Sequence, residues 1–252
     1  MIRFVEGAAR REFDALCGGS AFGCKLAAVA NAYGFNRPFA RFWVGGGAAY
    51  CLLDGVLSMA GQPEDVEEAW SFIHMTGPEA LFCPADFSAG EEVISSTEGL
   101  VLAKQLPAGP EAGLPEPPRL EEVHRLLCGA GMAVEFEPFY LDLSHRLRHG
   151  AALALGEYRD GALVGCAVVS AVTEASALLS AVVVEENFRR QGIGSALVER
   201  VERALPGRTL YLMRERDNNQ AFYAGLGYVE AGRWAQLELP RRPQRPHICG
   251  AL

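Results

Sequence analysis

The segment from Val182 to Val201, VVVEENFRRQGIGSALVERV, holds the residues whose types and spacing most directly suggest chemistry. A run of β-branched residues typical of a strand gives way to a helical pattern through two arginines and two glycines. Gly192 and Gly194 leave the backbone free to turn successive N–H groups at a helix start toward one anion. The helix dipole and the charges of Arg189 and Arg190 attract that anion further. The segment therefore predicts a phosphate-binding loop.

Two common phosphate loops do not fit this segment. A dinucleotide-binding GxGxxG motif needs a third glycine where this chain has Leu197. A Walker A loop needs a lysine followed by serine or threonine, and no lysine occurs after Lys104. The bound phosphate is therefore expected to belong to another class of ligand.

The pattern [Arg/Gln]-x-x-Gly-x-[Gly/Ala] is matched by Arg189, Gly192 and Gly194, and FYAGLGY (Phe222–Tyr228) follows in the next expected helix. With the order of the expected elements, these motifs resemble the GNAT superfamily of N-acetyltransferases over about residues 98–240. The resemblance implies that the loop binds the pyrophosphate of acetyl-CoA and that the strand before it holds the pantetheine arm. The residues so assigned are Val182, Val183, Val184, Arg189, Arg190, Gln191, Gly192, Ile193, Gly194, Ser195 and Asn219.

The resemblance also assigns Tyr223 as the acid that protonates the leaving thiolate, a role that suits a phenol near a sulfur of comparable basicity. The alternative for Tyr223 is a core aromatic residue. Glu157, Glu185 and Glu186 are candidates for the general base, but each is also explained as a solvated carboxylate, and a water chain could take the proton instead. No single base is assigned.

Four further residues can each be interpreted in two ways. Asn218 or Asn219 could contact the cofactor or cap the helix that follows. His145 and His149 are spaced four apart, which would suit a metal pair. Because no third ligand is apparent, we interpret both histidines as helix-surface residues, and we expect no bound metal.

The order of hydrophobic patterns predicts an α+β fold. From residue 98 onward we expect strand, helix, helix, three strands, helix, strand, helix and one or two final strands. The proline-rich residues 106–119 then form a strand-to-helix loop. Residues 1–97 are expected to repeat this order in a shorter form: two helices, three strands, a helix over 63–77 with Pro63 in its first turn, and a strand.

We therefore expect a GNAT-like mixed β-sheet flanked by helices, built as a tandem. Residues 1–97 would be a truncated, degenerate copy and residues 98–252 the complete catalytic copy. At the position of the phosphate loop the first copy has VLSMAGQPEDVEEAW, with acids and no arginine, and it should not bind CoA. The irregular end after residue 239 is expected to be a tail.

The charge, hydropathy and cysteines of the sequence indicate which kind of protein to expect. Residues 1–130 carry 17 acidic and 9 basic side chains and the remainder carries 14 of each, which argues against a nucleic-acid surface. No window approaches the roughly 18 apolar residues of a membrane span, and no signal region is evident at the start. The seven scattered cysteines suggest reduced thiols. We expect a cytoplasmic monomer or homodimer.

The favoured function is transfer of an acetyl group from acetyl-CoA to a primary amine of a small molecule or peptide, through a direct ternary complex. The acceptor would approach between the two domains. The alternative is a non-catalytic CoA-binding or protein-interaction module built on the same fold.

Overall fold

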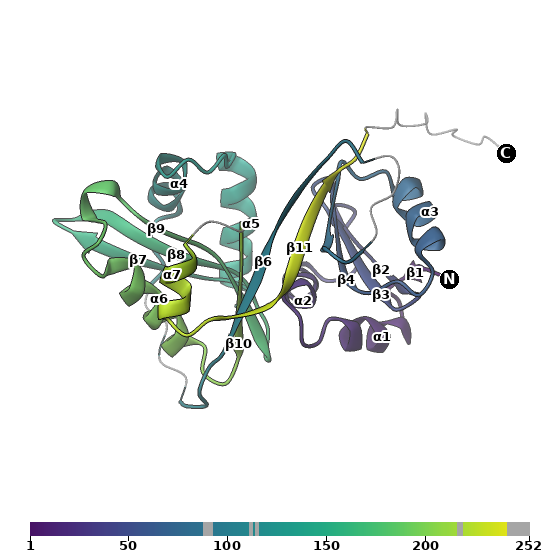
Figure 1. The fold of residues 1–252 in the computed structure, drawn as a ribbon, viewed down its shortest axis with the longest axis horizontal. Coiled ribbons are helices and arrows are strands. Elements are labelled where there is room, and N and C mark those ends of the chain that lie inside the picture. Colours follow the sequence, from purple (N-terminus) through teal and green to yellow (C-terminus); the bar gives the residue numbers. More distant parts are fainter. Residues whose placement is uncertain (88–92, 111–112, 114–115, 216–218, 241–252) are drawn as a thin grey trace.

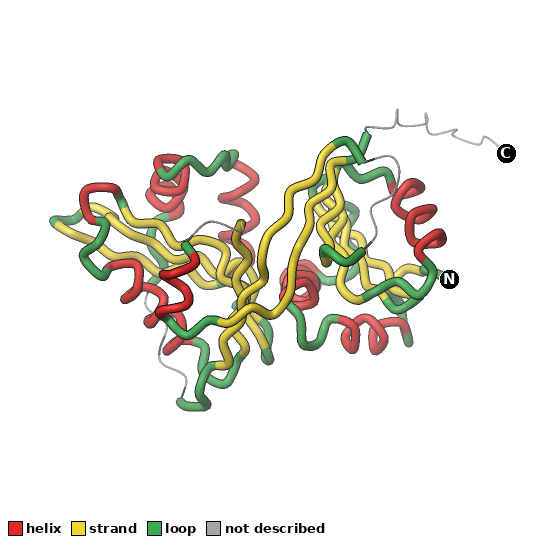
Figure 2. The backbone as a smooth tube through the Cα atoms, in the orientation of Figure 1, coloured by secondary structure: helices red, strands yellow, loops and turns green. Residues whose placement is uncertain are grey.

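The computed structural model describes residues 1–87, 93–110, 113, 116–215 and 219–240 (Figures 1 and 2). Its N-terminal part begins with a short strand that was not expected, β1 (Arg3–Phe4). The elements that follow have the expected order: α1 (Ala9–Leu16), α2 (Ala21–Tyr33), β2 (Ala40–Gly45), β3 (Ala48–Leu53), β4 (Val56–Gly61), α3 (Val66–Thr76) and β5 (Ala80–Pro84). Pro63 lies outside α3, contrary to expectation. The helix begins later because the Asp65 side chain caps it, accepting a hydrogen bond from Glu68 N at 3.0 Å.

The C-terminal part also follows the expected order. It contains β6 (Ser95–Gln105), α4 (Leu120–Gly129), α5 (Phe136–Arg148), β7 (Leu153–Arg159), β8 (Ala162–Val172), β9 (Ser176–Val184), the 3-10 turn η1 (Glu186–Phe188), α6 (Ile193–Ala204), β10 (Thr209–Glu215), α7 (Gln220–Gly225) and β11 (Val229–Glu238). The proline-rich segment joins β6 to α4. The last strand is single, with a bulge between Glu230 and Gly232. The expected tail lies almost wholly outside the described residues.

All eleven strands belong to one mixed sheet with the order β1-β2-β3-β4-β5-β11-β6-β10-β9-β8-β7. Two pairs, β4 with β5 and β9 with β10, are parallel, and each is connected by a helix. Strand β11 lies at the centre, where it pairs with β5 on one side and with β6 on the other. Figure 1 shows β6 and β11 as a long ribbon between the two parts of the molecule. The tandem is therefore joined through a shared sheet, and the boundary at residue 98 stays a prediction.

The helix α2 lies between the two parts and contacts strands from both of them. It packs against β3 and β4 and also against β8 and β9. Its residues are buried almost all round, as expected for a helix that is apolar on every face. Its core includes Phe42 and Phe82 from the N-terminal part and Leu178 and Tyr211 from the C-terminal part. This helix therefore holds the two parts in a fixed relation.

The expected internal repeat is visible in the topology. Strands β2, β3 and β4, helix α3 and strand β5 have the same order and the same parallel closing pair as β7, β8, β9, α6 and β10. On the opposite side of the sheet from α2, α3 packs on the first unit and α6 on the second.

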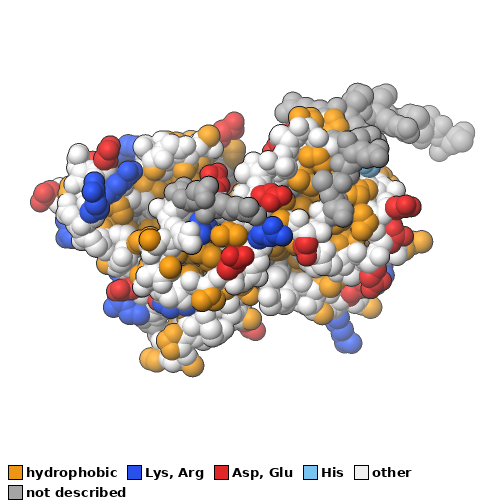
Figure 3. Space-filling model, in the orientation of Figure 1, with side chains coloured by type: hydrophobic (Ala, Val, Ile, Leu, Met, Phe, Trp, Pro, Cys, Tyr) orange, Lys and Arg blue, Asp and Glu red, His pale blue; other side chains and the backbone are white. Residues whose placement is uncertain are grey.

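The face of the molecule in Figure 3 shows acidic and basic side chains interspersed, without a continuous basic stripe.

Candidate active site

The parallel strands β9 and β10 separate toward their C-terminal ends. They pair only from Thr209 opposite Ser176 to Leu212 opposite Leu179. Beyond that point β9 stays paired with β8, and its other edge has no strand partner in the described part of the chain. The two strands thus open a gap beside the last residues of β9.

The main-chain groups of Val182 and Val184 face this gap. Glu185 N donates to Val164 O of β8 at 2.8 Å. Along an antiparallel strand, the main-chain N–H and C=O groups of successive residues point alternately toward one neighbouring strand and away from it. Those of Val182 and Val184 therefore point away from β8. The Arg189 side chain reaches back, and its Nε donates to Val184 O at 3.0 Å. The predicted pantetheine strand has the free edge that such a role requires.

The phosphate loop takes a left-handed conformation at two positions. Arg190 has a φ of 60° and Gly192 a φ of 79°. Glycine adopts such an angle without cost, whereas Arg190 is strained there by about 1 kcal/mol or more. Helix α6 starts directly afterwards at Ile193. The sequence motif indicated that the loop needs its two glycines, but it did not indicate that the backbone of Arg190 is strained.

The start of α6 has no capping side chain. Its first backbone hydrogen bond runs from Ala196 N to Gly192 O at 3.0 Å, so the N–H groups that precede Ala196 have no intrahelical acceptor. A Cβ added at Gly194 would lie 3.6 Å from the Phe222 ring, so a longer side chain would compete with that ring for space. The helix therefore begins with an uncovered set of backbone donors.

A cleft of about 670 Å³ brings the predicted residues together. Its lining includes Val182, Val183, Val184, Arg189, Arg190, Gly192, Ile193, Gly194, Ser195, Asn219 and Tyr223. Gln191 is not among them, because its amide turns back and donates to Asn187 O at 3.2 Å. Asn219 does not cap α7 with its side chain, and Asn218 lies outside the described residues.

Four lining residues were missed by the sequence reasoning. Phe188 and Phe222 flank the loop, and Ala130 and Met132 come from the connection between α4 and α5. None of them belongs to the phosphate motif. Only the pairing of strands far apart in the sequence brings the α4–α5 connection to this cleft, so no local pattern could have indicated it.

Tyr223 is half-buried on α7 at the wall of the cleft. Burial raises the pKa of its phenol, and the nearby positive charge of Arg214 partly opposes that rise. Its ring meets the rings of Phe222 and Tyr228 edge-on, with centroids 4.9 and 5.8 Å away. The two readings of this residue are therefore compatible: it packs as an aromatic side chain and keeps a protonated hydroxyl at neutral pH.

The three candidate bases lie elsewhere. Glu157 forms ion pairs with Arg159 at 3.0 Å and Arg200 at 3.4 Å, which marks it as structural. Glu185 and Glu186 are exposed and line a neighbouring depression. Among the described residues that line the cleft with Tyr223 there is no carboxylate. The structure therefore adds no assignment of a base.

His145 is not the surface residue we expected. Its Nε2 lies 2.9 Å from Ala32 O at the end of α2, and its ring stacks on Tyr33 at 4.4 Å. Tyr33 in turn donates to Asp142 of α5 at 2.6 Å. His149 is exposed, as expected. These contacts tie α5 to α2, and the described residues contain no cluster of three potential metal ligands.

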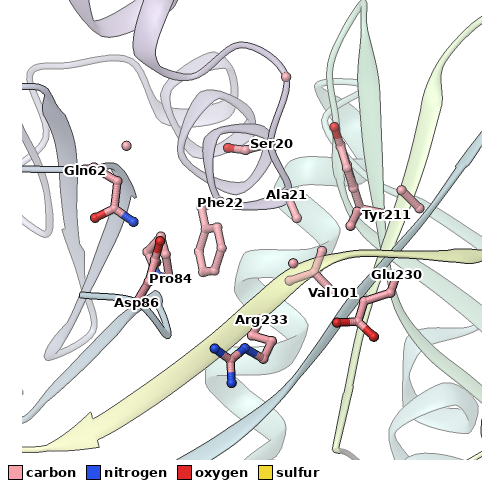
Figure 4. A pocket seen from close by; sticks show the side chains of 15 residues that line it. Ser20, Ala21, Phe22, Gln62, Pro84, Asp86, Val101, Tyr211, Glu230 and Arg233 are labelled. Carbon is pink, nitrogen blue, oxygen red and sulfur yellow. The ribbon is translucent and has the colours of Figure 1, made fainter. Parts of the chain in front are cut away.

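A second cavity, of about 540 Å³, lies where the two parts meet (Figure 4). Ser20 and Phe22 at the start of α2 form one wall, and Tyr211 of β10 forms part of another. Two carboxylates, Asp86 and Glu230, also line it. Since side chains alternate along a strand, Tyr211 faces this cavity while Leu210 and Leu212 pack beneath α6. The cavity therefore lies on the face of β10 that points away from α6, and it shares no lining residue with the cleft.

Two further features bear on the class of protein. No described helix is long and apolar enough to cross a bilayer. The six described cysteines are free thiols, of which Cys128 alone is exposed.

Comparison with known proteins agrees with this geometry. Residues 154–230 match a family described as "Acetyltransferase (GNAT) domain". The C-terminal part of the chain carries a GNAT domain. The match spans β7 to α7, and so includes the free edge of β9, the phosphate loop and Tyr223.

Solved structures show the same fold over nearly the whole chain. A tandem GNAT protein from the clavulanic acid biosynthesis pathway, described as without AcCoA, is 18% identical and has a TM-score of 0.57, covering 97% of this chain and 100% of its own. A GCN5-related N-acetyltransferase from Kribbella flavida is 19% identical with a TM-score of 0.56, covering 88% and 96%. One from Sphaerobacter thermophilus is 17% identical with a TM-score of 0.55, covering 96% of each chain. The comparison with curated proteins found no match.

The chain thus has the GNAT fold, with a tandem GNAT protein among its structural neighbours. The unit built from β2 to β5 has the order of strands and helix seen in the GNAT domain, but it has no equivalent phosphate loop. In its place the Asp65 carboxylate occupies the start of α3, followed by Glu67 and Glu68 in the first turn. An anion would be repelled there.

Proposed function

We propose that this chain is an N-acetyltransferase that moves an acetyl group from acetyl-CoA to a primary amine of a small molecule or peptide. One observation carries the proposal: the edge of β9 that has no described strand partner, the uncapped start of α6 and Tyr223 border the same cleft. Each of these fits one part of the donor, namely the amide-containing arm, the pyrophosphate and the thioester sulfur.

The residues present fit acetyl-CoA. The uncapped N–H groups before Ala196 and the guanidinium of Arg190 would hold the pyrophosphate. Main-chain groups of Val182 and Val184 would pair with the amides of the arm, as a neighbouring strand does. When bound, the donor supplies an activated acyl group whose carbonyl carbon accepts a nucleophile.

Tyr223 would act as the general acid. The amine nitrogen forms a bond to the carbonyl carbon as the carbon–sulfur bond breaks, and Tyr223 gives its proton to the departing sulfur. The proton lost by the amine goes to solvent, from which the phenolate is reprotonated. The raised pKa of Tyr223 keeps the phenol in the donating form at neutral pH. No cysteine is among the described lining residues, which supports direct transfer without an acyl-enzyme.

The acceptor would enter through the cavity between the two parts, on the face of β10 that points away from α6. Asp86 and Glu230 line this cavity together with one cation, Arg233, so the lining has an excess of one negative charge that would attract a protonated amine. In this proposal residues 98–252 bind the donor and residues 1–97 complete the acceptor site. A reducing compartment such as the cytoplasm would suit the free thiols.

The test is calorimetric titration of acetyl-CoA into the wild type and into Arg190→Glu combined with Gly192→Asp. The double variant reverses a charge and covers the start of α6, so binding should be lost. Unchanged tight binding would remove the donor site from the proposal.

The alternative, a CoA-binding or interaction module, is favoured by one observation: no carboxylate is among the described residues of the cleft. Incubation of the wild type with acetyl-CoA and a panel of amines, with free thiol as the readout, separates the two functions. Binding without thiol release across a broad panel would favour the module.

A further inference from the structure

Lysine is used at only two positions in this chain, Lys25 and Lys104, among 23 basic residues. Lys104 has an ordinary role, because its ammonium lies 2.7 Å from the carboxylate of Glu202. Lys25 is placed differently. It comes from the middle of α2, the apolar helix between the two parts of the molecule, and its Nζ lies 4.4 Å from the centre of the Phe82 ring.

Lys25 borders a third cavity, of about 310 Å³, which shares no lining residue with the cleft or with the cavity of Figure 4. Its walls are mainly apolar and include Leu26, Val29, Leu53 and Phe82. Small-molecule sites are typically concave, mostly apolar and at least about 300 Å³ in volume, with a few polar groups that orient the ligand. The cavity therefore has room for a compact organic molecule.

The charge of Lys25 is not neutralised by the protein. Within the part of the chain that the structure describes, its ammonium makes no hydrogen bond or ion pair, and it lies over the Phe82 ring. Burial lowers its pKa from 10.5 to about 8; the positive charge of Arg146 adds to this and the negative charge of Asp142 opposes it. The fold thus keeps a cation at an energetic disadvantage, which an anion in the cavity would relieve.

A hydrogen-bond donor lies at the same cavity. Ser58 of β4 is buried and lines it, and the described residues provide no hydrogen-bond partner for its hydroxyl. Gln236, also in the lining, is engaged by Glu238 at 2.9 Å. The lining also contains one carboxylate, Asp54, which is an exposed residue of the turn between β3 and β4 and forms no ion pair with Lys25 in the described structure. Away from that turn, one cation and one hydroxyl on a mainly apolar wall match a monoanion on an apolar body better than a phosphate, which needs several donors.

We propose that this cavity binds a small organic acid, with its carboxylate paired to Lys25 and hydrogen-bonded to Ser58 and its apolar body against Leu26, Val29 and Phe82. The site lies in the part of the molecule that has no phosphate loop. It is separate from acetyl transfer and does not depend on the proposed enzymatic function.

The binding test uses the full chain with hexanoate and its neutral analogue hexanamide, measured by calorimetry at neutral pH. Hexanoate should bind at least about tenfold more tightly than hexanamide, the preference expected for a partly desolvated ion pair. Lys25→Met keeps the volume and removes the charge, and it should abolish this preference. Ser58→Ala should weaken hexanoate binding severalfold, and Lys104→Met should leave it unchanged.

A second measurement guards against a variant that merely misfolds. Because there are only two lysines, protein labelled with ¹³C-lysine gives two Cε signals, and Lys104→Met assigns them. Hexanoate should raise the pKa of Lys25 in the wild type and leave that of Lys104 in place. The charged groups that face Lys25 are Asp54 of the β3–β4 turn and Asp142 and Arg146 of α5. The Cys51 thiol stays neutral because burial raises its pKa to about 12.

Equal affinity for hexanoate and hexanamide, or an unmoved Lys25 signal at saturating hexanoate, would overturn the proposal. In that case the cavity is filled by water, and Lys25 is simply hydrated.

Discussion

Asp65 and Gly192 stand at the same position in two similar units, immediately before a helix that joins a pair of parallel strands. Asp65 caps α3 and places a carboxylate at its start, whereas Gly192 turns through a left-handed conformation and leaves the start of α6 uncovered. The strands and helices of the two units have the same order, and this exchange, together with Glu67 and Glu68 in the first turn of α3, predicts that the start of α3 repels anions and that the start of α6 attracts them.

Gly192→Asp should therefore give the start of α6 a carboxylate like the one that Asp65 places at the start of α3. The added carboxylate would occupy the donors of α6, so acetyl-CoA affinity is expected to fall about tenfold or more. Calorimetric titration measures this. The matched control is Asp65→Ala, which should cost about 1 kcal/mol of unfolding free energy through the lost cap and leave acetyl-CoA affinity unchanged. Equal affinities for Gly192→Asp and the wild type would contradict the site.

Tyr223→Phe should lower kcat about a hundredfold and leave the acetyl-CoA Kd near that of the wild type, because only the proton donor is lost. The ring contacts with Phe222 and Tyr228 are kept, so stability should hardly change. In the wild type the raised pKa of this phenol keeps the acid form present, so kcat should not decline through loss of this proton until the pH exceeds the usual tyrosine value of about 10. An unaltered kcat in the variant would exclude the acid role.

Replacing the carboxylates of the cavity between the two parts should affect only the acceptor. In Asp86→Asn combined with Glu230→Gln, the KM for a cationic amine should rise about tenfold while acetyl-CoA affinity stays constant. Glu238→Gln, on the same strand as Glu230 but outside the lining, serves as the control. If KM is insensitive to the pair, the amine enters by another route.

The stability of the wild type should depend on pH through Lys25. Its pKa is about 8 when folded and 10.5 when unfolded, so between these values the unfolded chain binds more protons and the unfolding free energy rises with pH. Below pH 8 the full cost of the buried charge is present. Lys25→Met should remove this rise and stabilise the protein at pH 7 by about 1 to 3 kcal/mol. Chemical denaturation of both proteins at pH 7 and at about pH 10.5 measures the free energy of unfolding at each pH. If that free energy changes equally with pH in the wild type and in Lys25→Met, the prediction is wrong.

Much of the fold could be predicted because the signals are local. Alternating and helical patterns marked nearly every element, and Arg189, Gly192 and Gly194 marked the phosphate loop. What could not be predicted depends on contacts between distant segments. The ring of His145 stacks on Tyr33 across more than a hundred residues of sequence, and Met132 reaches the cleft only after the sheet has formed.

The surroundings of individual side chains could not be predicted from the sequence either. Gln191 lies within the motif, yet it turns away from the cleft because an acceptor, Asn187 O, is within reach. Lys25 gave no signal in the sequence, since one lysine in an apolar helix does not reveal whether its ammonium meets an acid, the solvent or a cavity.

The position of β11 has a consequence for how the protein is made. Residues 229–238 leave the ribosome after every other strand, yet they fill the centre of the sheet between β5 and β6. Until they arrive, the nascent chain has two unfinished sheets with exposed edges, which are surfaces prone to mispairing. Assembly of the whole sheet therefore waits for residues 229–238, and a chain that stops before residue 229 would have two half-sheets without the strand that pairs with both.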